Sequence, residues 1–233
     1  SAGAAPMPFL RKILSDHREM EAQICRMNGI ETGIVRIGTF SSVAIHWLPN
    51  LFAALQKDYP GIEYEMLLGD YDEVEQWIDE GRVDCGFLRL PTRPKFDTIL
   101  LKQDEYQVVL PVGHPLAQQE AVDIRALNAL PFLLLEHGGK AEVSDLLEQS
   151  QVRPDIRFTT WEDVAIMAMV ERGMGVGILP DVILRRIPYR LEIRPLKEPY
   201  YRSIGLAMKH AAHLTPAARK FIDYLPFREA DCS

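Results

Sequence analysis

The sequence has few cysteines, and none of them lie close together. Cys25, Cys85 and Cys232 are odd in number and form no C-x-x-C pair. This pattern excludes a disulfide framework, argues against a zinc site and fits a reducing compartment. At 233 residues the chain is long enough to bury a stable core without crosslinks, as one large α/β domain or as two smaller ones.

Long apolar runs and an excess of basic residues are also missing. No apolar run approaches the roughly 20 residues that cross a bilayer, and residues 1–8 lack the pattern of a signal peptide. Acidic residues outnumber Lys and Arg by 33 to 26, without a dense basic stripe, so this part of the chain is not expected to bind DNA by itself. We expect a cytoplasmic protein with no membrane partner.

Motifs for catalysis and cofactors are absent from the sequence. The six histidines show no H-E-x-x-H spacing, and neither a G-x-S-x-G elbow nor a Walker loop occurs. The glycines of 173–177 precede a strand instead of following one, so they predict a helix stop and a tight strand entry rather than a dinucleotide loop. We expect no catalytic residue, no metal and no cofactor.

An apolar stripe marks the first expected helix, residues 6–28. Its members recur at alternating spacings of three and four residues over three heptads: Leu10, Ile13, His17, Met20, Ile24 and Met27. This pattern favours pairing with a second helix in a dimer or tetramer. An amphipathic helix packed on its own domain is the alternative.

From residue 33 the sequence alternates between strand and helix patterns. The expected strands are 34–37, 62–67 and 83–88, with helices from about 47 and over 73–80 between them. This βαβαβ order predicts a parallel sheet. After a Pro-bearing stretch at 91–94, a second series begins at Tyr106, which predicts a second lobe. Its expected elements are strands 132–135, 156–158 and 176–179 and helices 142–149 and 163–172, and a strand at 204–208 and a helix at 216–224 close the chain.

Four polar residues are expected at the ligand-binding edge of the first sheet. Ser41 and Ser42 lie between a strand end and a helix start, where hydroxyls and amides hold anions, although they could equally cap the helix. Arg89 follows the strand 83–88, where it could grip a carboxylate or form a surface ion pair. Tyr71 follows the second strand, with loop packing as its alternative role.

Several short motifs occur in an order that resembles the effector-binding portion of LysR-type transcriptional regulators. They are Val35–Gly38, Leu48-Pro49, Tyr59-Pro60, Gly81–Asp84, Gly113–Ala117 and Gly173–Pro180. The resemblance covers about 33 to 225 and implies an α/β fold with two Rossmann-like lobes of the type 2 periplasmic-binding-protein kind. Crossover strands would join the lobes and a linker helix would precede them. Lobe I would be 33–105 plus 208–233, and lobe II would be 106–207.

The resemblance also implies roles for individual residues. Ser41, Ser42, Tyr71 and Arg89 from lobe I, with Glu136, His137 and Gly138 from lobe II, would bind a small organic acid between the lobes. An acid at Glu136 is unusual beside an anion, so it would pair with Arg89 or contact a cationic group. DNA would be bound only by the family's N-terminal winged helix-turn-helix, which this sequence lacks.

Two other classes share this fold. One is a transport binding protein, against which the heptad helix and the unpaired cysteines argue. The other is an enzyme, such as a menaquinone-pathway lyase or a phosphoribosyltransferase, for which Glu136 with His137 is the sole acid and base candidate.

Overall fold

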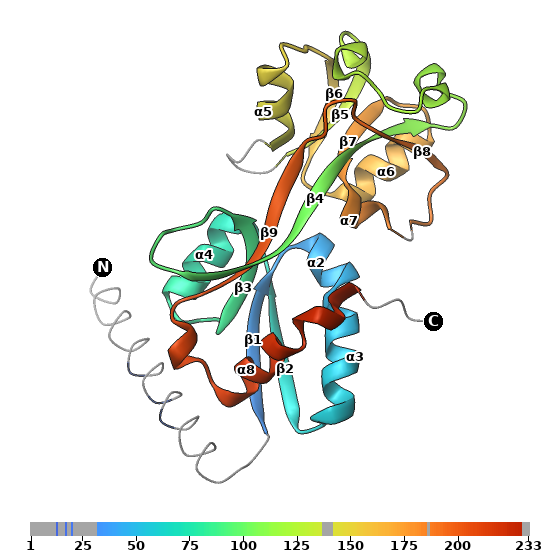
Figure 1. The fold of residues 1–233 in the computed structure, drawn as a ribbon. Helices are drawn as coiled ribbons and strands as arrows, with labels where there is room; N and C mark the ends of the chain where they lie inside the picture. The colour runs from blue at the N-terminus through green and yellow to red at the C-terminus, as the bar shows by residue number, and fades with distance from the viewer. Residues whose placement is uncertain are drawn as a thin grey trace, which may run out of the picture. The chain divides into compact units, whose positions relative to one another are not determined.

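Two units make up the chain in this computed structural model, which describes residues 13, 17, 20, 32–136, 142–185 and 187–229. Unit 1 is residues 1–102 with 203–233, and unit 2 is residues 103–202. The chain passes between them twice, within strand β4 (Asp97–Pro111) and within strand β9 (Tyr201–Met208) (Figure 1). The lobe borders expected from the resemblance, 105/106 and 207/208, fall in the same two strands and stay a prediction.

Unit 1 begins with the βαβαβ order that the sequence predicts. Its elements are β1 (Gly33–Thr39), α2 (Ser41–His46), α3 (Leu48–Asp58), β2 (Ile62–Leu68), α4 (Tyr71–Asp79) and β3 (Cys85–Leu90). Strand β1 pairs in parallel with β2 and β3, and β9 pairs antiparallel with β3. The strand order is β2-β1-β3-β9, and the predicted parallel sheet is therefore confirmed.

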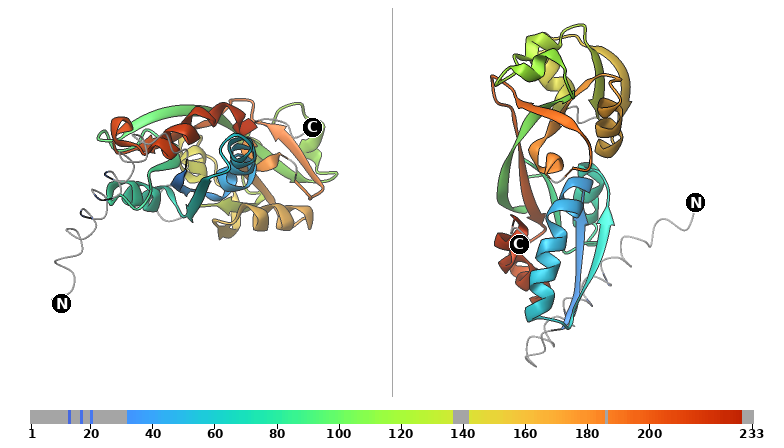
Figure 2. Two further views of the ribbon diagram at one scale, coloured as in Figure 1. Left: turned by 90° about the horizontal axis from the view of Figure 1, so that it is seen from below. Right: turned by 90° about the vertical axis from the view of Figure 1, so that its right-hand side faces the viewer.

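Helices cover both faces of the unit 1 sheet. Gly38 of β1 faces Val74 of α4, whereas Gly33 faces Ala217 of α8 (Pro216–Asp223). Successive residues of a strand point to opposite faces, so α4 lies on one face and α8 on the other. Helix α3 shares the α8 face, where the Phe52 ring lies 6.3 Å from that of Phe221 (Figures 1 and 2). The short 3-10 turns η3 (Ala211–His213) and η4 (Leu225–Glu229) flank α8.

Several element bounds in unit 1 differ from the sequence predictions: β3 begins at Cys85 rather than 83, β9 begins at Tyr201 rather than 204, and two further differences lie close to the expected site. Helix α4 begins at Tyr71 rather than Glu73, because two reciprocal hydrogen bonds cap it one residue earlier. The Glu73 amide donates to the Asp70 carboxylate, and the Asp70 amide donates to the Glu73 carboxylate. Strand β3 extends to Leu90 rather than ending at 88, because it continues along β9. Distant pairing of this kind leaves no local pattern in the sequence.

Unit 2 repeats the same strand order. Its elements are η1 (Pro115–Gln118), η2 (Ile124–Leu127), β5 (Pro131–Leu135), α5 (Glu142–Gln149), β6 (Asp155–Thr160), α6 (Asp163–Glu171), β7 (Val176–Pro180), α7 (Asp181–Leu184) and β8 (Leu191–Pro195). Strand β5 pairs in parallel with β6 and β7, β7 pairs antiparallel with β4, and β8 pairs with the other side of β4. The order β6-β5-β7 thus matches β2-β1-β3 of unit 1.

Alternating side chains give unit 2 one core on each face of its sheet. Phe132 and Ile178 pack with Leu146 of α5 on one side. Leu133 and Leu179 pack with Ile166 of α6 on the other. The central strands β5 and β7 are apolar on both faces because both are covered, as is usual for parallel sheets.

The closely spaced glycines end α6 and allow the start of β7 to pack closely on its neighbour, as the sequence predicts. Gly173 has φ +73°, a conformation that favours glycine, and its amide donates to the Val170 carbonyl at 2.8 Å. A Cβ at Gly175 would lie 2.7 Å from the Pro131 carbonyl oxygen, so β7 packs there against the start of β5.

The structure describes three residues of the expected linker helix. Ile13, His17 and Met20 are helical, and the side chains of Ile13 and Met20 are 62% and 52% exposed. Leu10, Ile24 and Met27 lie outside the described residues. Among the helices that are described, none combines the length and apolar character needed to span a membrane.

Candidate functional site

The carboxyl end of β1 leads directly into α2. The last strand residue, Thr39, is fully buried, and Ser41 and Ser42 are the first two helical residues. The cap position belongs to Phe40, and no side chain caps this helix, so the capping role considered for the serines is wrong. Ser42 is buried at 3% exposure, whereas Ser41 is half-buried.

Arg89 lies beside this segment, but inside β3 rather than after it. In the parallel pair of β1 and β3, Gly38 is level with Gly86, and β1 ends one residue later at Thr39, so Arg89 stands beyond the end of β1. Side chains alternate along β3: Gly86 faces α4, whereas Phe87 contacts Trp47 and Phe221 on the opposite face. Arg89 has the parity of Phe87 and therefore lies on the face of α2 and α3.

Tyr71 reaches the same edge from the helix on the other face. It is the first residue of α4 rather than a loop residue, and its ring makes an edge-to-face contact with Phe40 at 5.0 Å. Its ring also packs on the apolar cluster around Val74 and Trp77. Tyr71 therefore does pack against its neighbours, which was the alternative role considered for it.

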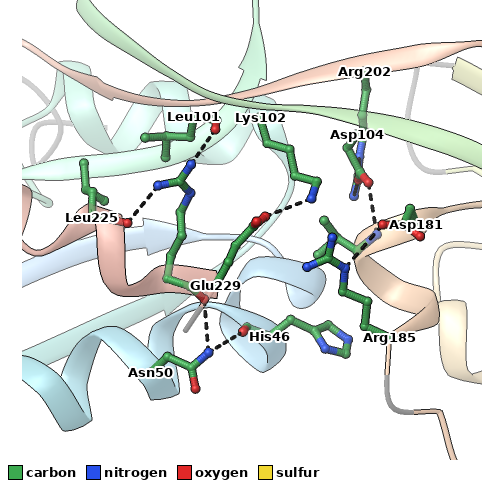
Figure 3. Close-up of polar contacts among 12 residues, drawn as sticks. His46, Asn50, Leu101, Lys102, Asp104, Asp181, Arg185, Arg202, Leu225 and Glu229 are labelled. Atoms are coloured by element: carbon green, nitrogen blue, oxygen red, sulfur yellow. Dashed lines mark hydrogen bonds and ion pairs between the residues drawn. The ribbon is translucent and has the colours of Figure 1, made fainter. Parts of the chain in front are cut away.

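The C-terminal segment holds α2 and α3 in position, which the sequence did not indicate. The Asn50 side chain donates to the carbonyl of His46, the last residue of α2, at 3.4 Å and to that of Arg228 at 3.1 Å (Figure 3). The Arg228 guanidinium lies 5.5 Å from the Trp47 ring centroid and donates to the Leu101 carbonyl at 2.6 Å. These contacts fix the end of the helix that carries Ser41 and Ser42.

The equivalent edge of unit 2 carries Glu136, which follows β5. Its amide donates to the Thr160 carbonyl at 2.9 Å, and its carboxylate accepts from the Ser144 hydroxyl at 2.6 Å. His137 and Gly138, the other two residues expected here, lie outside the described residues.

Comparison with known proteins identifies the family. A model described as the LysR substrate binding domain matches residues 28–227. The chain belongs to this family. The resemblance found in the sequence is therefore confirmed, as is the fold of two Rossmann-like lobes that LysR domains share with type 2 periplasmic binding proteins.

Relatives and solved structures agree with this assignment. The probable HTH-type transcriptional regulator LrrA of Synechococcus elongatus is 31% identical over 228 residues, covering 96% of this chain and 76% of LrrA. HinK, a LysR family regulator from Pseudomonas aeruginosa, is 28% identical with a TM-score of 0.76, covering 97% and 80% of the two chains. The BenM effector binding domain, solved with its effector benzoate, has a TM-score of 0.73 at 21% identity. The match covers 83% of this chain and 90% of the BenM domain.

No metal centre accompanies this LysR site in the part of the chain that the structure describes. Within residues 32–136, 142–185 and 187–229, together with 13, 17 and 20, no three His, Cys, Asp or Glu side chains are grouped to hold an ion. The one described cysteine, Cys85, is fully buried, and this burial raises the pKa of its thiol well above the ordinary value.

A buried carboxylate also lies at the unit 2 edge of the LysR domain. Asp163 is the first residue of α6 and only 5% exposed, and it accepts from the Val164 amide at 2.7 Å. Burial raises the pKa of Asp163, the Glu162 charge adds to the rise, and the Val164 bond and the Arg202 charge oppose it. The folded protein therefore holds a proton on Asp163 more tightly than the unfolded chain does.

Asp163→Asn is expected to raise the melting temperature at pH 7. An acid whose pKa is raised by folding makes stability fall as pH rises from about 4 through the folded pKa, because the native state then loses its preferred proton. The variant removes this loss, which a series of thermal melts from pH 4 to pH 8 would record. Glu162→Gln, which removes the neighbouring exposed charge, should make the slope only slightly shallower, because that charge adds to the rise but burial is its largest cause. A lower melting temperature for Asp163→Asn at pH 7 would mean that attraction to Arg202 outweighs burial.

Proposed function

We propose that this LysR domain binds a small organic acid at the carboxyl edge of the unit 1 sheet. The observation that carries the proposal is the position of Arg89, which lies past the end of β1 on the sheet face that α2 and α3 cover. Open α/β sheets bind ligands at the carboxyl ends of their strands where the strand order reverses, which here is the boundary of β1 and β3. A guanidinium at that point grips a carboxylate through two hydrogen bonds, and the serine hydroxyls can bind its oxygens.

The BenM domain, which shares this fold, was solved with benzoate. This relative supports an aromatic acid as the first class to test, with dicarboxylic acids as the second. The effector acts only if it binds one conformation of the domain more tightly than another. We propose that this preference passes through paired linker helices to an N-terminal DNA-binding domain, and that the protein works in the cytoplasm, where its DNA is.

The proposal predicts that an organic acid stabilises the wild-type domain and that Arg89→Ala removes this effect. A thermal-shift screen of aromatic and dicarboxylic acids would find the ligand, because a compound that binds only the folded state raises the melting temperature. Losing a charged partner of a bound carboxylate costs about 2 kcal/mol or more, so Kd should rise about 30-fold or more in calorimetry. Ser42→Ala should give a smaller rise of the same sign.

Arg153→Ala is the matched control, because Arg153 is an exposed arginine of unit 2. Its Kd should equal that of the wild type. Full affinity in both Arg89→Ala and Ser42→Ala would show that the site is elsewhere. The ligand should also be recovered unchanged after incubation, whereas its turnover would favour the enzyme alternative.

A further inference from the structure

One of the three tryptophans is exposed, and it lies at the carboxyl edge of unit 2. Trp47 and Trp77 are buried at 2% and 9% exposure, whereas Trp161 is 49% exposed. Trp161 directly follows Thr160, the last residue of β6. This is the edge of the sheet where α/β folds bind ligands, and a large exposed ring there provides apolar contact area.

Glu136 is level with Trp161 on the neighbouring strand. Strands β5 and β6 are parallel, with Leu135 opposite Thr160, so the next residue of each chain segment is Glu136 and Trp161. The bond from the Glu136 amide to the Thr160 carbonyl, at 2.9 Å, holds the two segments together beyond the strand ends. Neighbouring strands are about 4.8 Å apart, which brings the carboxylate and the indole within reach of one small group.

One oxygen of the Glu136 carboxylate is held by a hydrogen bond, and within the part of the chain that the structure describes the other oxygen, Oε1, accepts none. Ser144 of α5 donates its hydroxyl to Oε2 at 2.6 Å, and the residue is half-buried. Among residues 32–136, 142–185 and 187–229, no Lys, Arg or His forms an ion pair with Glu136. Two arginines of the described residues have carboxylate partners of their own: Arg202 pairs with Asp104, and Arg185 pairs with Asp181.

We propose that Trp161 and Glu136 form a subsite for an ammonium group. A cation is attracted to the face of an indole more strongly than to any other aromatic side chain. The carboxylate adds a charge-assisted hydrogen bond, which is stronger than a neutral one. A carboxylate ligand is repelled by Glu136 and gains neither interaction. The subsite goes beyond the proposed function, which assigns only the group that binds an acid in unit 1.

Three probes of one shape test the subsite: benzylamine, benzyl alcohol and benzoate, which are cationic, neutral and anionic at pH 7. Benzylamine should change the tryptophan fluorescence of the wild-type domain saturably, with a Kd at least tenfold lower than that of benzyl alcohol. Glu136→Gln should raise the benzylamine Kd about tenfold. Trp161→Leu should raise it similarly in calorimetry, where the missing fluorophore does not matter. Glu148→Gln, an equal charge change at an exposed position of α5, should have no effect.

Collisional quenching tests the same pair without a ligand. Caesium should quench the exposed indole more than iodide does, each relative to neutral acrylamide, and Glu136→Gln should narrow this difference. Equal quenching by both ions overturns the proposal. So does benzylamine binding that survives both substitutions, or a Trp161→Leu variant whose only change is in oligomeric state. Loss of acid binding in Arg89→Ala with normal benzylamine binding would leave this subsite intact, so the two proposals fail separately.

Discussion

Asp104→Ala is expected to destabilise the domain by about 3–5 kcal/mol, the usual cost of leaving a buried charge without its partner. Asp104 is fully buried and Arg202 is 7% exposed. The guanidinium donates to one carboxylate oxygen through Nε and Nη2, both at 2.8 Å, and the Val182 amide donates to the other at 3.0 Å (Figure 3). Removing the carboxylate takes this acceptor away from a buried cation and a buried amide.

The position of the Asp104–Arg202 pair explains why the stability of unit 2 is expected to depend on it. Asp104 lies near the start of unit 2 and Arg202 is its last residue, so the pair joins the two strands by which the chain enters and leaves this unit. The bond to Val182 adds the first turn of α7, which follows β7. Urea denaturation followed by circular dichroism would measure the change in the free energy of unfolding.

An exposed pair of the same residue types is the control. Arg157 and Asp155 approach to 2.6 Å, but their side chains are 62% and 45% exposed. Solvent screening limits such a pair to about 1 kcal/mol or less, so Asp155→Ala should have little effect. Asp104→Asn, which keeps an acceptor for the Val182 amide, should fall between the two. Equal losses for Asp104→Ala and Asp155→Ala would contradict the assignment of the cost to burial.

The parts of this fold that the sequence predicted depend on short-range patterns. Helix α5 has its predicted bounds because Val143, Leu146 and Leu147 form one apolar face within two turns. The residues 173–177 predicted a helix stop because the positive φ of Gly173 is a local requirement. Helix α7 and strand β8 were missed, since α7 is a single turn and β8 is half-buried along its length, with no clear alternation.

The sequence named residues for the candidate site, and their membership in it stays a prediction, but it did not predict the geometry around them. The strand-end rule placed Ser41 and Arg89 at one edge, and in the structure Ser41 follows the end of β1 while Arg89 lies past that end on β3. The extension of β3 along β9 depends on residues from the far end of the chain, so no local pattern could place Arg89 within a strand. Trp161 was missed for a different reason: a single aromatic residue after a strand forms no motif, and only its exposure distinguishes it.

The second large effect is expected in the linker helix, where Ile13→Asp with Met20→Asp should convert the protein from a dimer or larger assembly into monomers. Ile13 and Met20 are one heptad apart, helical, and 62% and 52% exposed within a single chain. Two large apolar side chains on one helical seam are typical of a paired helix. Burying each contributes about 1.5–3 kcal/mol, and a dimer buries two from each copy.

Aspartate at these positions loses that burial and places charges opposite each other in the seam. The dimer Kd should therefore rise more than about 100-fold, which sedimentation equilibrium over a range of protein concentrations would record. The melting temperature of the two units should change little at concentrations where both proteins are monomeric, because Ile13 and Met20 are exposed in the single chain.

Val112→Asp separates a specific seam from general surface hydrophobicity. Val112 is 64% exposed, as much as Ile13, but it lies directly after β4 in unit 2 and belongs to no heptad. Its substitution should leave the dimer Kd unchanged. A wild-type protein that is monomeric at all concentrations would favour the alternative of a helix packed on its own domain. Equal weakening by Val112→Asp would mean that general surface hydrophobicity, not the seam, drives the assembly. Loss of assembly in the Ile13 and Met20 variant alone would instead make the heptad seam the contact between copies, and with it the route by which ligand binding reaches a second chain.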